Sequence, residues 1–342
     1  MEVLKDPSSL AIFGVRGANG VIIITTKKAK EGQTLVNINT SFGWKHVVDR
    51  IKMVNASQFK ELYSEQLVNE KNPAFDFSGW NADTDWQDEV LQNGFITNNN
   101  ISVTGASEKH SFYLGMGYSY EQGNIKHEKF SKITLNASNE YKITDKIKVG
   151  FQFNGARMLP ADSKSVLNAV RTTPIALVFN EEYQLYAALP EFQKAQMMNP
   201  MVDVDLKANT TRAENYRASG NIYGEVDFLE HFNFRAVFSM DYGSNNGRTY
   251  QPIIKVYDNT VKGNVATLGT GKTEVSQFKE NETKVQSDYV LTYTNSFGDH
   301  NLTATAGFTT YYNSLSRLDA ARGQGIGLVI PDNPDKWFVS IG

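Results

Sequence analysis

Apolar and polar residues alternate with a period of two over most of the chain after Lys30. In the clearest run, residues 112–120, the even positions hold Phe, Leu, Met, Tyr and Tyr, and the odd positions between them are mostly Gly and Ser. This alternation predicts a β-strand with one apolar face. The pattern recurs at 36–44, 133–141, 147–153, 222–228, 234–242, 289–293 and 302–308, with a weaker segment at 96–107. We therefore predict about nine antiparallel strands over 33–313, many near the ~10 residues of a tilted membrane strand.

The faces opposite these apolar series are polar. They carry charges and amides such as Lys148, Arg217 and Asp241. Water on one side of an ordinary antiparallel sheet explains such a face, and so does the water-filled lumen of a membrane barrel. Alternation alone does not separate these alternatives.

The connections between the predicted strands do separate them. Every second connection is tight, and the others are longer, with the longest at 48–95, 156–215 and 244–284. This rhythm is typical of a barrel with short turns at one rim and long extracellular loops at the other. An aromatic girdle near the long-loop ends fits the same fold. Its predicted members are Trp44, Tyr118, Tyr120, Tyr216, Tyr242, Tyr289 and Tyr312. The predicted fold class is all-β, an antiparallel transmembrane β-barrel.

The first long loop carries two helix signals. Asn55 with Gln58 predicts a capping box, and Thr84 with Gln87 repeats the spacing before Val90. We interpret both as short solvated elements folded over a rim.

The amino-terminal segment has a different character. Asp6 is a predicted N-cap with Pro7 at the first helical position, and Gly14 ends the short helical turn between them. Asn19-Gly20 predicts a tight turn. The β-branched run 21–26 that follows predicts a strand buried on both faces.

Composition removes several function classes. The net charge of −3 and pI near 6.0 give no case for nucleic-acid binding. The chain has no cysteine, and its five histidines are dispersed, so the sequence predicts no metal, no cofactor and no enzyme activity. The run ATLGTGKT at 266–273 lacks the first glycine of a phosphate-binding loop, and we interpret it as a loop tip. No apolar run reaches the ~20 residues of a membrane helix.

The stretch EVLKDPSSLAIFGVRGANGVIIITTKK, residues 2–28, resembles the end of the plug domain of TonB-dependent outer-membrane transporters. RGANGVIIITTKK is similar to the SusC/RagA branch found in Bacteroidota, as are TDWQDEVLQNG, ISVTGASEKHSFYLGMGYSYEQGNIK, FSKITLNASNEYKITDKIKVGFQF and FGDHNLTATAGF. The residues that carry the plug resemblance, in a structural role, are Asp6, Pro7, Gly14, Arg16, Gly17, Asn19 and Gly20.

This resemblance implies that residues 1–30 are the carboxyl-terminal part of an α/β plug and that 31–342 are the first part of the barrel. Such barrels have roughly 22 strands around a plugged lumen, so we expect an interior fragment with an incomplete barrel. The implied function is active import of oligosaccharides or peptides across the outer membrane. The implied partners are outer-membrane lipid, TonB with its inner-membrane energising complex, and a SusD-like surface lipoprotein. The sequence assigns no substrate-binding residue.

An alternative function remains open. The chain could be a β-rich surface protein that binds glycan without transport, its strands packed as a sandwich and its loops forming the binding surface. A structure separates the two, because a sandwich places Phe112, Met116 and Tyr118 in a closed core between two sheets.

Overall fold

The structure is a computed structural model. It describes residues 2–6, 19–23, 31–162, 164, 166–208, 210–324 and 330. The predicted helical turn 8–13 and the predicted site residues Pro7, Gly14, Arg16 and Gly17 lie outside the described residues.

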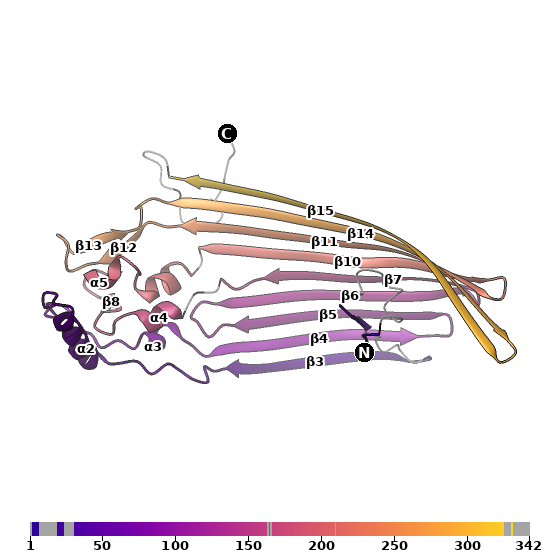
Figure 1. The fold of residues 1–342 in the computed structure, drawn as a ribbon, viewed down its shortest axis with the longest axis horizontal. Helices are drawn as coiled ribbons and strands as arrows, with labels where there is room; N and C mark the ends of the chain where they lie inside the picture. Colours follow the sequence, from indigo (N-terminus) through magenta and orange to yellow (C-terminus); the bar gives the residue numbers. More distant parts are fainter. Residues whose placement is uncertain are drawn as a thin grey trace.

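One antiparallel sheet of nine strands dominates the chain (Figure 1). Neighbours in the sheet follow one another along the sequence, so the sheet is a simple meander with β3 and β15 at its edges. The prediction of about nine antiparallel strands is confirmed. The strands are β3 (Thr34–Lys45), β4 (Gly94–Ala106), β5 (His110–Gln122), β6 (Lys129–Thr144), β7 (Ile147–Leu159), β10 (Thr211–Phe228), β11 (Phe232–Gln251), β14 (Glu274–Phe297) and β15 (His300–Gly323).

The strand register places the predicted apolar series on one face of this sheet. Ile38, Ile101, Met116 and Leu135 lie opposite one another on successive strands. Met116 is 55% exposed and Tyr118 is 42% exposed. Among the described residues no second large sheet covers this face. The sandwich alternative is therefore wrong, and the apolar face is available to lipid.

Short and long connections separate to the two ends of the sheet. The turns 107–109, 145–146, 229–231 and 298–299 lie at one end, and the long connections 46–93, 160–210 and 252–273 gather at the other (Figure 1). The third long loop is shorter than its predicted range of 244–284. Residues 244–251 of β11 and 274–281 of β14 pair with each other as strand. Both faces of this extension are largely polar, so no alternation marks it in the sequence.

The girdle prediction is wrong for part of its set. Trp44, Tyr120 and Tyr216 lie close to the long-connection ends of their strands. Tyr289 lies nearer the 298–299 turn, and Tyr312 lies near the middle of β15. The error follows from the strand lengths, because β14 and β15 each contain 24 residues and extend past the alternating segments.

The long connections fold together into a small structured unit, here called the loop body. It contains the helices α2 (Ala56–Asn69), α3 (Trp86–Val90), α4 (Leu167–Arg171) and α5 (Glu191–Lys194) and the π-helical segment η2 (Val202–Leu206). Its short strands are β8 (Phe179–Asn180), β9 (Leu185–Tyr186), β12 (Ile254–Tyr257) and β13 (Val265–Leu268). The strand β12 pairs with β13, and β8 with β9.

The loop body has its own hydrophobic core. Trp86 and Val90 of α3 are 3% and 1% exposed and pack with Ala169, Leu189 and Met201 of the second long connection, among others. A second cluster joins Ala188 and Val202 to Ile254 and Val256 of the third. The expectation of solvated loop elements is therefore wrong for α3. Burying a side chain such as Val90 stabilises the folded chain by about 1.5–3 kcal/mol.

The two predicted helix caps have different outcomes. Asn55 caps α2 with the predicted capping box, in which the side chains and backbones of Asn55 and Gln58 bond reciprocally. For α3 the cap is Asp85, not Thr84. The Asp85 side chain accepts from the N–H groups of Gln87 and Asp88, because the Thr84 hydroxyl donates to the Ala176 carbonyl at 2.8 Å.

At the amino terminus, β1 (Glu2–Leu4) pairs antiparallel with β2 (Val21–Ile23), in a sheet separate from the nine-stranded one. Gly20 has a φ of +98°, which explains the glycine at this turn. Ile22 is 58% exposed, so the expectation that this strand is covered on both faces is not met within the described residues.

Across the described part of the chain, no helix has the length and apolar character needed to cross a membrane.

Candidate functional site

The polar face of the nine-stranded sheet is the first surface with functional chemistry. Its β7–β11 region carries paired charges. Lys148, Glu225 and Arg235 lie directly opposite one another on β7, β10 and β11. The Glu225 carboxylate is 3.2 Å from the Lys148 ammonium and 3.8 Å from the Arg235 guanidinium. Each charge therefore has a partner of the opposite sign, and the wall is polar with little net charge.

A region rich in amides and hydroxyls adjoins it on β3–β7. Asn39, Asn100, Gly117 and Thr134 form one row of this face. A hollow of about 480 Å³ nearby is lined by hydroxyl and amide side chains, by aromatic rings and by the carboxylate of Glu140. The amides and hydroxyls among them donate and accept hydrogen bonds without carrying charge. The predicted lumen-facing polarity therefore consists of a part rich in amides and hydroxyls and an ion-paired part.

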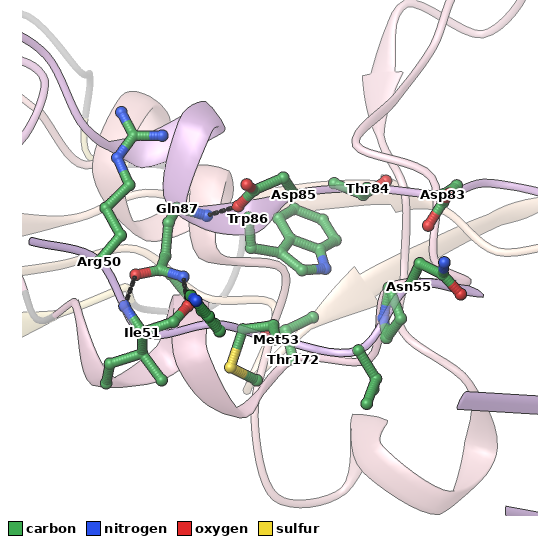
Figure 2. A pocket seen from close by; sticks show the side chains of 14 residues that line it. Arg50, Ile51, Met53, Asn55, Asp83, Thr84, Asp85, Trp86, Gln87 and Thr172 are labelled. Carbon is green, nitrogen blue, oxygen red and sulfur yellow. Dashed lines mark hydrogen bonds between the residues drawn. The ribbon is translucent and has the colours of Figure 1, made fainter. Parts of the chain in front are cut away.

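The second surface lies in the loop body, where a cavity of about 410 Å³ opens beside α3 (Figure 2). Arg50, Met53, Asp83 and Trp86 are among the residues that line it. Most of its polar groups already hold the loops in place. The Asp83 carboxylate accepts from the Ala56 N–H at 2.7 Å. We interpret this cavity as a structural joint between the 46–55 segment and α3.

Trp86 connects two of the long connections at this joint. Its indole N–H donates to the Thr173 carbonyl oxygen at 2.8 Å. The Thr173 N–H in turn donates to the Gln193 side-chain oxygen at 3.0 Å. A buried indole needs such a partner. The motif TDWQDEV contained the signal for this contact, a capped helix start with a large aromatic in its first turn, but the sequence did not show what the ring packs against.

Ion pairs hold the second and third connections together. The Lys194 ammonium of α5 lies 3.2 Å from the Asp258 carboxylate and 2.6 Å from Glu191. Burial acts to raise the pKa of Asp258, but hydrogen bonds from the Thr260 hydroxyl and N–H and the Lys194 charge outweigh it, so this pKa lies below its ordinary value. Sequence reasoning did not find this pair, because 64 residues separate its members.

The Tyr186 hydroxyl donates to Asp205, and His127 Nε2 lies 2.7 Å from the other oxygen of the same carboxylate. Burial and this carboxylate raise the pKa of Tyr186. The contact ties the 123–128 connection between β5 and β6 to the loop body. Within the described residues no group of three or more His, Asp or Glu side chains could hold a metal ion.

The predicted plug residues are only partly described. Asp6, Asn19 and Gly20 lie beside the β1–β2 pair, and Asn19-Gly20 immediately precedes β2 as a turn. The other four lie outside the described residues, so the structure does not bring the motif together as one site.

Comparison with known proteins identifies the fold. The chain matches no family model. It is 29% identical over 326 residues to TonB-dependent receptor P3 of Formosa agariphila, covering 90% of this chain and 30% of that protein. It is 28% identical over 255 residues to TonB-dependent receptor SusC of Bacteroides thetaiotaomicron, covering 68% of this chain and 25% of that protein. The chain is similar to SusC-type TonB-dependent receptors.

Solved structures agree with this resemblance. The structure of the RagAB peptide transporter matches with a TM-score of 0.75 at 18% identity, over 94% of this chain and 39% of that chain. At this identity the match shows the SusC/RagA fold alone. The names of these proteins are those of receptors and transporters, in agreement with the prediction that the chain is not an enzyme. The chain spans about a third or less of the length of the curated relatives it matches.

Proposed function

We propose that this chain forms part of a TonB-dependent importer of the outer membrane. In this proposal residues 1–30 belong to the plug and 31–342 to the barrel and its extracellular loops. The importer takes up large nutrients, oligosaccharides or peptides, through the lumen. TonB and its inner-membrane complex supply the energy, and a SusD-like surface lipoprotein covers the extracellular end.

The observation that carries the proposal is the two-faced meander. Its outward face is apolar and exposed, while its inward face holds ion pairs, amides and hydroxyls in register. A sheet of this kind fits between lipid and a water-filled lumen. The separation of short turns from the folded loop body supports a periplasmic and an extracellular rim (Figure 1). The similarity to receptors named for TonB supports the energy source.

Growth and uptake test the proposal. We expect the gene product to fractionate with the outer membrane of its host. Deleting the gene should abolish uptake of one class of oligosaccharide or peptide, and a plasmid copy should restore it. A protonophore should stop uptake while leaving surface binding intact, since binding needs no energy. A surface binding protein without transport would instead leave uptake insensitive to the deletion.

A further inference from the structure

The three long connections meet at a second cavity, here called the junction pocket, of about 330 Å³. Residues 79–82 of the first connection, several residues over 175–188 of the second, and residues 257 and 259 of the third line it. Its floor includes Ala187 and Ala188, which are nearly fully buried. Asn81 and Asn259 are exposed at its edge. The pocket is therefore open to solvent at its mouth and closed beneath.

Hydrogen bonds between the connections fix the shape of the junction pocket. The Ala188 N–H donates to the Tyr257 carbonyl oxygen at 2.6 Å, and Ala187 pairs with Tyr257 in a parallel bridge. The Asn259 side-chain amide donates to the Gly79 carbonyl at 3.4 Å. A Cβ at residue 79 would lie 2.7 Å from the Asn259 nitrogen, so glycine permits this approach. A pocket held by three segments is preformed.

The lining of the junction pocket is uncharged. Its polar and aromatic side chains are Trp80, Asn81, Asn180, Tyr257 and Asn259, and no Lys, Arg, Asp or Glu is among its lining residues. The cavity of Figure 2 differs in this respect, since Arg50, Lys52, Asp83 and Asp85 line it.

Each of the three asparagines uses one end of its amide within the protein. Asn81 and Asn259 donate through Nδ2 to the carbonyls of Ser78 and Gly79, and Asn180 accepts through Oδ1 from the Tyr183 N–H. The other ends, two carbonyl oxygens and one NH₂ group, have no hydrogen-bond partner among the described residues. They can therefore offer both acceptors and a donor to a ligand at the mouth.

We propose that the junction pocket is a binding subsite for one neutral sugar unit of an oligosaccharide. This inference rests on the proposed function and narrows its substrate class. Sugar hydroxyls both donate and accept, which matches the amide ends, and the apolar face of a sugar ring packs on an aromatic ring. A charged side chain or terminus of a peptide would find no partner of opposite charge in this lining, and a buried charge without a partner is costly. Pockets of this size with few polar groups are typical ligand sites.

The test uses single-residue variants in the gene at its own locus. Asn180→Ala and Asn259→Ala each remove one amide, and Trp80→Leu removes the ring. Asn69→Ala is the matched control, because Asn69 is exposed at the end of α2 and does not line the pocket. The protein is extracted from outer membranes, and binding is measured by calorimetry. The probes are neutral gluco- and manno-oligosaccharides, uronic-acid oligosaccharides and a tryptic digest of casein.

We expect wild type and the Asn69→Ala protein to bind neutral oligosaccharides alike. Each asparagine variant should bind about three- to tenfold more weakly, and the Trp80→Leu protein more weakly still. Heat-modifiable gel mobility checks that each variant is folded. Unchanged affinity in folded asparagine variants would overturn the subsite. Binding of only acidic oligosaccharides or peptides would also overturn it, while uptake of those probes would leave the importer proposal standing. Neutral-sugar binding without energised uptake would retain the subsite and reject the importer.

Discussion

Gln87 bonds to both backbone polar groups of Ile51. Its Nε2 donates to the Ile51 carbonyl at 2.7 Å, and its Oε1 accepts from the Ile51 N–H at 3.1 Å (Figure 2). Gln87 is 5% exposed and lies in α3, whereas Ile51 belongs to the extended segment that leaves β3. One buried amide thus satisfies the backbone of a segment that has no strand partner there. The contact fixes the entry of the first long connection into the loop body.

We expect Gln87→Ala to release this segment. The change leaves the Ile51 backbone groups without their partner and should cost about 1–3 kcal/mol locally. Trypsin added to outer-membrane vesicles should then cleave after Arg50 or Lys52 faster than in wild type. Gln66→Ala is the control, since Gln66 makes an exposed bond to Glu70 at 2.9 Å on α2. Equal cleavage rates in the two variants would contradict the role of Gln87.

The Lys194–Asp258 pair should make the loop body sensitive to acid. The folded pKa of Asp258 lies below its ordinary value, and its side chain is only 4% exposed. The stabilisation is therefore complete above the unfolded pKa of about 4 and is lost as the pH falls through the folded pKa. The Asp258→Asn protein should lack this stabilisation at neutral pH already. The measurement is the urea midpoint of unfolding followed by tryptophan fluorescence from pH 7 to pH 3, with points on both sides of about pH 4.

Two outcomes check this assignment. The difference between wild type and Asp258→Asn should shrink at the acid end of the range, because protonated wild-type Asp258 no longer pairs with the Lys194 ammonium. Asp145→Asn serves as the control, since Asp145 is exposed in the turn between β6 and β7. A difference that stays constant with pH would show that the Asp258 charge contributes nothing.

At Gly94 the backbones of β4 and β5 approach each other too closely for any side chain on residue 94. A Cβ there would lie 2.1 Å from the Gln122 carbonyl oxygen, a backbone atom of the neighbouring strand. We expect Gly94→Ala to cost about 1–3 kcal/mol by forcing β4 and β5 apart at their long-connection end. The yield of heat-modifiable protein in the outer membrane should fall. Gly243→Ala should not change it, since nothing lies within 4 Å of a Cβ at that site.

The sequence predicted the part of the fold in which the two faces of the sheet differ in polarity. Strand positions and faces followed from alternation, because an apolar face and a polar face on one strand give residues a period of two. The same reasoning missed 244–251 and 274–281, where β11 and β14 pair with largely polar residues on both faces. A period of two is visible only where the faces differ.

The candidate sites were much harder to predict. Trp80, Asn180 and Asn259 come from three connections, and nothing local indicates that they line one pocket. Thr84 and Asp85 are both good caps by residue type, and the choice depended on the Ala176 carbonyl, 92 residues away from Thr84. Local propensity therefore located the helix, and only tertiary contacts decided its first residue.

The last prediction concerns the 342-residue chain expressed by itself. In the described structure β3 pairs only with β4 and β15 only with β14, so the sheet has two edges and does not close. Each unsatisfied backbone group in hydrocarbon costs several kcal/mol, which prevents stable insertion of an open sheet. In water the exposed apolar face and the two edges favour association. We expect the chain alone to aggregate or oligomerise, and liposomes prepared with it to take up no labelled oligosaccharide. Heat-modifiable gel mobility and uptake assays check this expectation. A monomer that shifts on heating and imports the probe would show that nine strands suffice, against the physical argument from open edges.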